Sequence, residues 1–215
     1  MLIVYRRPCE RRKLAEKMNL ELRSLKTVPL LEGEEGVKFL NLQGNQISVL
    51  QNIVSLPNLS FLNLGANQIK SLASMGNFEQ SLSNLKVLIM CKNKLQTEGL
   101  SATDPALKSP FSYLPCLDLL DLHQNQFSGA FDFAKLGFGG LSKLRIMNLS
   151  FNKIEQVVLN CSLPSLCELN LRNNEINSFA VEAPLDCLQK LYLQNNKIST
   201  LQSIKSGCLP KLKDL

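Results

Sequence analysis

The sequence of 215 residues predicts an α/β solenoid, in which short repeated units stack and share one apolar core. The first observation behind this prediction is the pattern LxxLxLxxNxI, which occurs seven times, with its asparagines 22, 26, 32, 27, 22 and 22 residues apart. The second is that the leucine spacing suits neither an amphipathic helix, with steps of three and four, nor a long alternating strand. Seven successive copies make this the signature of a leucine-rich repeat.

Each position of the pattern has a structural reason, which the copy LSFLNLGANQI at residues 59–69 illustrates. Leu62 and Leu64 point to the same side of a short strand, toward the core. Successive strands then form a parallel sheet on the concave face of a horseshoe, and 3-10, helical or irregular segments return along the convex face. We therefore expect a leucine-rich repeat solenoid with a short-stranded sheet.

An asparagine follows each predicted strand, at the point where the chain turns. Its amide carries both donors and an acceptor, so it can satisfy backbone groups of its own turn and of the neighbouring one. We therefore expect the seven asparagines to form a structural ladder along the solenoid. They are Asn45, Asn67, Asn93, Asn125, Asn152, Asn174 and Asn196.

The chain divides into a basic N-terminal arm at residues 1–17 and a repeat domain at residues 18–215. The arm holds six basic residues. We interpret it as a solvated extension. The alternative is that its positive charge binds nucleic acid, an anionic membrane or an acidic protein tail. A cap repeat (18–36) carries Arg23 in place of the asparagine, and seven full repeats (37–211) follow. Residues 212–215 begin a further repeat, so we expect the chain to be a fragment, because proteins normally cover an open repeat edge.

The segments that return from one strand to the next differ in length. In the regular repeats, apolar residues recur at every third position after the asparagine, which predicts short 3-10 turns on the convex side. Residues 96–116 form a longer return, which we expect to be an excursion loop with one helical turn. Residues 128–143 hold three phenylalanines and predict a short helix. Both long segments are candidates either for function or for extra packing.

The composition bounds the class of protein and its compartment. Hydrophobic residues make up 45% and charged residues 20% of the chain, and no apolar run approaches the roughly 18 residues of a membrane span. The seven cysteines are scattered without a CxxC pair, and no secretory signal is visible, so we expect free thiols and a cytoplasmic protein. No RNA-binding motif accompanies the net charge of +6, so we expect neither nucleic-acid binding nor membrane insertion.

The residues between the core leucines face the inner surface of the predicted horseshoe. One column is apolar over five repeats and charged thereafter, and an extended segment or a helix of another protein could dock on it. The alternative is that these side chains are passive filler, half-covered by their neighbours. The predicted protein-binding residues are Phe39, Phe61, Val87, Ile89, Leu119, Asp121, His123, Ile146 and Tyr192.

One pair of residues on this face raises the question of catalysis. Cys91 and His123 occupy matching positions in adjacent repeats, about 5 Å apart, and a Cys–His pair can in principle make an activated thiolate. We expect Asp121 to lie too far along its strand to orient the imidazole easily, and the ligand spacing matches no known metal module. The sequence contains no glycine-rich phosphate loop and no nucleophile elbow. It therefore predicts a binding protein that is not an enzyme, without cofactor or metal.

Two resemblances narrow the expected function. The regular 22-residue units resemble the intracellular subclass typified by the leucine-rich regulatory subunit of protein phosphatase 1. The stretch MNLELRSLKTVPLLEGEEGVKFLNLQGNQI (18–47), with its P-x-L-x-G-E-E turn at 29–35, more narrowly resembles the leucine-rich repeat subunit of the tubulin polyglutamylase complex. This resemblance implies an adaptor in a cytoskeletal complex, at microtubules, centrosomes or cilia. The alternative is a regulatory subunit that binds a phosphatase catalytic subunit.

Overall fold

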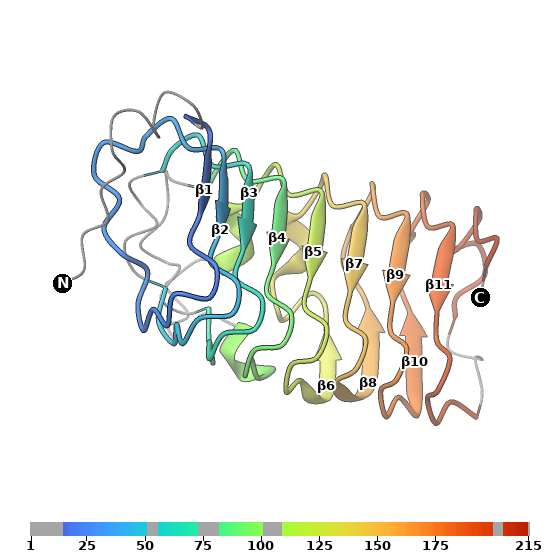
Figure 1. Cartoon of the computed structure of the whole chain (residues 1–215). Helices are drawn as coiled ribbons and strands as arrows, with labels where there is room; N and C mark the ends of the chain where they lie inside the picture. The colour runs from blue at the N-terminus through green and yellow to red at the C-terminus, as the bar shows by residue number, and fades with distance from the viewer. Residues whose placement is uncertain (1–14, 51–55, 73–81, 101–108, 200–203, 215) are drawn as a thin grey trace.

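The fold was analysed in a computed structural model of the chain, which describes residues 15–50, 56–72, 82–100, 109–199 and 204–214. Most of the predicted basic arm (1–14), and the middle part of the predicted excursion loop (101–108), lie outside the described residues. The described residues form an elongated stack of repeats that runs from residue 15 at one end to residue 214 at the other (Figure 1).

Eight strands of three residues each form a parallel sheet along the whole stack (Figure 1). They are β1 (Lys17–Asn19), β2 (Phe39–Asn41), β3 (Phe61–Asn63), β4 (Val87–Ile89), β5 (Leu119–Asp121), β7 (Ile146–Asn148), β9 (Glu168–Asn170) and β11 (Lys190–Tyr192). Each repeat adds one strand beside the strand of the repeat before it, in the order β1-β2-β3-β4-β5-β7-β9-β11. The predicted solenoid of parallel strands is therefore confirmed.

A second parallel sheet, which the sequence did not predict, forms where the chain returns in the later repeats (Figure 1). It consists of β6 (Ser128–Asp132), β8 (Lys153–Leu159) and β10 (Ser178–Val181), in the order β10-β8-β6. These returns are rich in β-branched and aromatic residues such as Ile154, Val157 and Phe179, which pack well on a pleated surface. The 3-10 turns expected in the regular repeats are wrong for the returns that contain β8 and β10, whereas residues 51–55 and 200–203 of two other regular returns lie outside the described residues.

Three 3-10 helices complete the described secondary structure: η3 (Glu98–Leu100), η4 (Pro110–Tyr113) and η5 (Phe138–Gly140). The helical turn expected in residues 96–116 is present as η3 and η4, and the short helix expected in 128–143 is reduced to η5 behind strand β6. None of the described residues forms an α-helix. The α part of the predicted α/β class, and the horseshoe shape, are therefore not confirmed.

The asparagine after each strand of the full repeats holds neighbouring repeats together. Asn67 shows the arrangement: its Nδ2 donates to the carbonyl oxygens of Leu42 and Leu64, each at 3.0 Å, and its Oδ1 accepts from the backbone N–H of Ile47 at 3.0 Å. The other six make corresponding bonds to the preceding repeat and to their own. Among the described side chains, no buried nitrogen or oxygen atom lacks a hydrogen-bond partner. The ladder thus satisfies backbone groups that the leucine core leaves without partners.

The residue before each ladder asparagine has a left-handed backbone conformation. Only the first of the seven is a glycine, Gly44, and the others have φ between 51° and 60°. They are Ala66, Lys92, Gln124, Phe151, Asn173 and Asn195. Because a side chain is disfavoured at such φ values, the turn out of each strand stores a small strain, which the amide bonds beside it offset.

The phenylalanines of the two long repeats form a buried cluster. The rings of Phe111 in η4 and Phe138 in η5 are stacked with centroids 4.3 Å apart. Phe131 and Phe133 contact Phe138 at centroid distances of 5.7 and 5.1 Å, and all four side chains are buried. Of the two alternatives for the long segments, this part of the chain therefore serves packing.

Candidate functional site

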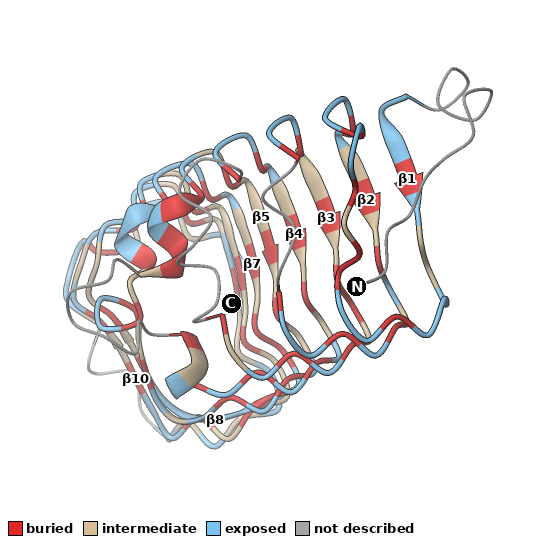
Figure 2. Ribbon diagram, turned by 90° about the vertical axis from the view of Figure 1, so that its left-hand side faces the viewer, coloured by how far each residue is buried: buried red, intermediate tan, exposed pale blue. Residues whose placement is uncertain are grey.

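The outward side of the eight-stranded sheet, named the strand face here, is built from the first and third residue of each strand. In β2, β3, β4, β5, β7 and β9 the middle residue is buried and the two residues beside it are half-buried (Figure 2). This follows from the alternation of side chains along a strand. The face therefore displays two columns of half-exposed side chains.

The first of these columns, named the apolar column, consists of Phe39, Phe61, Val87, Leu119 and Ile146. These residues are direct partners in the register of adjacent strands, so their side chains lie in one row. Phe39 and Phe61 are stacked with ring centroids 4.2 Å apart and planes 10° apart. In the next two repeats the same row holds two charged residues, Glu168 and Lys190, and Lys190 Nζ lies 3.5 Å from Glu168 Oε2.

The second column lies along the ends of the strands and is mostly amide. Asn19, Asn41, Asn63, Asn148 and Asn170 each accept a hydrogen bond at Oδ1 from the backbone N–H two residues later, at 2.9 to 3.1 Å. This cap of the strand end is a role that the sequence pattern did not reveal, although the recurring Asn in the third strand position was visible. The predicted site residue Ile89 interrupts the column between Asn63 and Asp121.

Tyr192 lies at the far end of the strand face, away from the apolar column. The guanidinium of Arg172 lies 4.1 Å from the centre of its ring, and Arg172 Nε also donates to the side-chain oxygen of Gln194 at 2.7 Å. The structure therefore does not bring Tyr192 together with the other predicted protein-binding residues.

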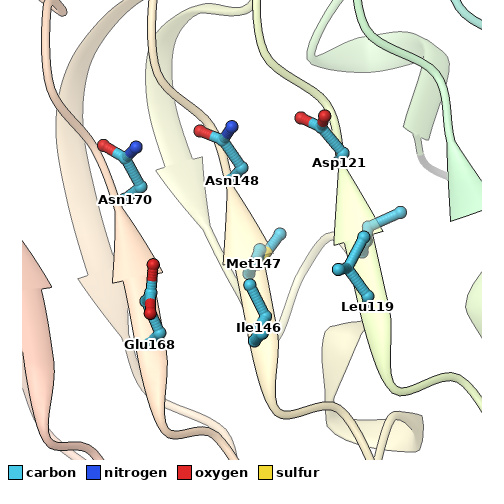
Figure 3. A pocket seen from close by; sticks show the side chains of 8 residues that line it. Leu119, Asp121, Ile146, Met147, Asn148, Glu168 and Asn170 are labelled. Carbon is cyan, nitrogen blue, oxygen red and sulfur yellow. The ribbon is translucent and has the colours of Figure 1, made fainter. Parts of the chain in front are cut away.

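A hollow of about 140 Å³ opens on the strand face between β5, β7 and β9 (Figure 3). Leu119 and Ile146 contribute apolar side chains, and Asp121 and Glu168 contribute carboxylates. Asn148 and Asn170 line the same hollow. The hollow thus combines apolar contact with acceptors for a donor group, which suits a side chain with an apolar stem and a basic end.

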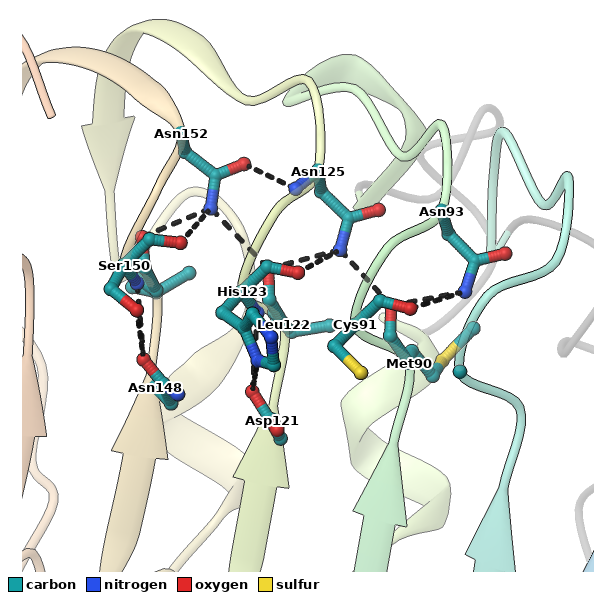
Figure 4. A network of polar contacts seen from close by, with 12 residues as sticks. Met90, Cys91, Asn93, Asp121, Leu122, His123, Asn125, Asn148, Ser150 and Asn152 are labelled. Atoms are coloured by element: carbon teal, nitrogen blue, oxygen red, sulfur yellow. Dashed lines mark hydrogen bonds and ion pairs between the residues drawn. The ribbon is translucent and has the colours of Figure 1, made fainter. Parts of the chain in front are cut away.

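Cys91, Asp121 and His123 come together beside this hollow (Figure 4). His123 Nδ1 lies 2.8 Å from Asp121 Oδ1, so the expectation that Asp121 lies too far away to orient the imidazole is wrong. The reason is the cap of the strand end: the backbone N–H of His123 also donates to Asp121 Oδ1, at 3.2 Å, which draws the two side chains together.

The Cys91 thiol is not an activated nucleophile in this setting. Burial is the main cause that raises its pKa above the ordinary value, and the negative charge of Asp121 adds to the effect. A thiol with a raised pKa stays protonated at neutral pH, and the thiolate is the reactive form. The six described cysteines, Cys91 included, are free thiols.

Comparison with known proteins agrees with this architecture. A family model for leucine-rich repeats, in two copies, matches residues 35–82. The solved leucine-rich repeat domain of APL1B has 18% sequence identity and a TM-score of 0.68, over 92% of this chain and 57% of its own. Internalin C2 from Listeria monocytogenes has 20% identity and a TM-score of 0.63, over 93% of this chain and 78% of its own.

The plant peptide hormone receptor RGFR1, solved in complex with RGF2, has 25% identity and a TM-score of 0.53, over 76% of this chain and 25% of its own. The chain thus spans little more than half of the APL1B domain and a quarter of the receptor chain. A search of curated protein sequences gave no match. Within the described residues, no helix has the length and apolar character needed to cross a membrane.

The repeat pattern, the stacked parallel strands and these similarities show that the chain has a leucine-rich repeat fold, and the family model matches two such repeats at residues 35–82. None of the similarities supports the narrower resemblance to the phosphatase regulatory subunit or to the polyglutamylase complex subunit.

Proposed function

We propose that this chain is a non-enzymatic adaptor that holds another protein on its strand face, the face that the sequence predicts as concave. The observation that carries the proposal is the apolar column, in which five half-exposed side chains lie in register on adjacent strands. Contiguous exposed apolar surface of this kind marks protein-binding sites.

The chemistry of the strand face fits a partner segment that lies across several strands. Covering the apolar column would contribute about 25 cal/mol for each Å² of apolar surface removed from water. The carboxylates of Asp121 and Glu168 in the hollow add polar specificity at one end. An extended segment or a helix with an apolar stripe and a basic residue is the partner chemistry that matches both features.

Similar proteins support a binding role for this fold. The plant peptide hormone receptor RGFR1, to which this chain is similar in structure, is solved in complex with RGF2. By analogy, the repeat scaffold of this chain would supply a rigid surface, and the half-exposed side chains on that surface would determine which partner binds.

The finer proposal is that the adaptor works in the cytoplasm, in a complex of the microtubule, centrosome or cilium. The resemblance of residues 18–47 to a subunit of the tubulin polyglutamylase complex supports it. The second candidate is a regulatory subunit of a protein phosphatase, which the regular 22-residue units support.

A series of substitutions distinguishes the two candidates. The tagged chain is used to capture partners from cell lysate, and binding of the captured protein is then measured for Phe39→Asp, Val87→Asp and Leu119→Asp. The adaptor hypothesis predicts that these variants lose binding, whereas Tyr192→Ala, at the far end of the strand face, keeps it. Losses spread over all these repeats would support docking of a whole phosphatase domain instead. Full binding by the three aspartate variants would contradict a site on the apolar column.

A further inference from the structure

We propose that Cys91, Asp121 and His123 form a binding site for a divalent transition-metal ion such as Zn²⁺ on the strand face. A thiol sulfur, a carboxylate oxygen and an imidazole nitrogen of these residues all lie within 4.8 Å of one another. No other group of three such ligands comes together in the part of the chain that the structure describes. The three residues come from adjacent repeats, so the fold itself brings the ligands together.

The donor atoms select the class of ion. Thiolate and imidazole ligands suit Zn²⁺ and its neighbours Co²⁺ and Ni²⁺, whereas Mg²⁺ and Ca²⁺ prefer a full set of oxygen ligands. Sites with three protein ligands leave one position of a tetrahedral ion open. Because all three side chains are half-buried on the strand face, that position would be reached from solvent and filled by water.

The distances require only a small adjustment. Metal bonds of about 2.0–2.3 Å in a tetrahedral site place ligand atoms about 3.3–3.6 Å apart. In the structure the three ligand atoms lie up to 4.8 Å apart, which is more than this spacing. The distance of 2.8 Å between His123 Nδ1 and Asp121 Oδ1 is less than this spacing. On ion binding, rotation of these half-buried side chains about their own bonds would shorten the longer separations and lengthen the contact between Asp121 and His123.

Comparison among the repeats shows what is unusual here. The third strand position holds asparagine in five repeats, where its oxygen caps the strand end. Asp121 keeps this cap, since it accepts from the backbone N–H of His123. An asparagine at position 121 could therefore make the same cap, and the cap does not require the negative charge of Asp121. Asp121 therefore departs from the asparagine pattern in the repeat that also supplies His123, beside the repeat that supplies Cys91.

The neighbouring repeat leaves space for the sulfur. Gly65 lies beside Cys91, and a Cβ atom at Gly65 would come within 3.1 Å of Cys91 Sγ. Lys92, whose positive charge would oppose an ion, is exposed and can extend into solvent. A larger residue at position 65 would therefore crowd the sulfur, and glycine does not.

The test is a titration of the whole chain, kept reduced by a phosphine, with Co²⁺ and then Zn²⁺. We expect one Co²⁺ per chain, with the charge-transfer absorption of a cobalt–thiolate bond, and displacement of Co²⁺ by Zn²⁺. Cys91→Ser should abolish the absorption. His123→Gln and Asp121→Asn should weaken binding at least about tenfold, since even residues that only orient metal ligands cost 10–100-fold when changed.

Cys161→Ser is the matched control, because this thiol is also half-buried, lies near one carboxylate, Asp132, and has its pKa raised by burial to about 11. It has no histidine beside it, so binding should be unchanged. Circular dichroism should show that all four variants are folded. The proposal is overturned if no thiolate band appears, if the band persists in Cys91→Ser, or if Cys161→Ser removes it equally.

Discussion

At the scale of single residues, the ladder asparagines do more than their spacing alone could show. Asn125 donates to the carbonyl oxygens of Met90 and Leu122 and accepts from the N–H of Leu95, all of them buried. The sequence could predict which asparagines form the ladder, because one side chain must supply donors and an acceptor at each turn. It could not predict the left-handed conformation of the residue before each one, because that position holds six different residue types, and only three of the seven residues are glycine or asparagine.

We predict that Asn125→Ala lowers the free energy of unfolding by about 2–4 kcal/mol, because buried backbone groups lose their partners. Chemical denaturation measures the loss. The control is Asn58→Ala, since Asn58 is exposed and makes a single bond to the carbonyl of Glu35. Equal losses in the two variants would contradict the ladder's structural role.

The left-handed turn gives a second prediction at this scale. Gln124 has φ of 51° and is exposed, whereas Gln126, two residues later, is exposed without positive φ. Gln124→Gly should leave the free energy of unfolding unchanged or raise it by up to about 1 kcal/mol, because glycine adopts this conformation freely. Gln126→Gly should lower it by about 0.5–1 kcal/mol. Denaturation curves of the pair test this, and the opposite order would contradict it.

At the scale of elements, the two parts of each repeat differed in how far they could be predicted. The strand of β3 follows from Leu62 and its neighbours, since the pattern repeats in seven copies. The return segments vary in length and have no common pattern, so β6, β8 and β10 depend on contacts between repeats. Such pairing is non-local, and a three-residue spacing does not distinguish a 3-10 turn from a short strand.

The phenylalanine cluster leads to a prediction about these elements. Phe138→Ala should lower the free energy of unfolding by about 3–5 kcal/mol, because it leaves a cavity among Phe111, Phe131 and Phe133. Phe151→Ala is the matched control, because Phe151 is 53% exposed, and it should change stability by no more than about 0.5 kcal/mol. A small loss for Phe138→Ala, measured by denaturation, would show that the two long repeats do not depend on the cluster.

At the scale of the whole molecule, the strand face is continuous because every repeat presents its strand at the same place. The apolar column could be predicted from the sequence, since alternation in a short strand determines which residues face outward. The contact of Asp121 with His123 could not, because it depends on the turn that caps β5. The strand position groups Tyr192 with Ile89 and Asp121, although strand β9 separates its strand, β11, from the last strand of the apolar column, β7.

Affinity capture from cell lysate with the tagged chain, identifying bound proteins by mass spectrometry, tests the central claim most directly when Phe61→Asp is compared with Phe151→Asp. Both changes put a carboxylate in place of a phenylalanine that solvent can reach, but Phe61 belongs to the apolar column and Phe151 does not. The account predicts that Phe61→Asp loses the captured partners with an unchanged melting temperature, while Phe151→Asp keeps them. Retained capture by Phe61→Asp, or a lowered melting temperature, would show that the column is core and not a binding site.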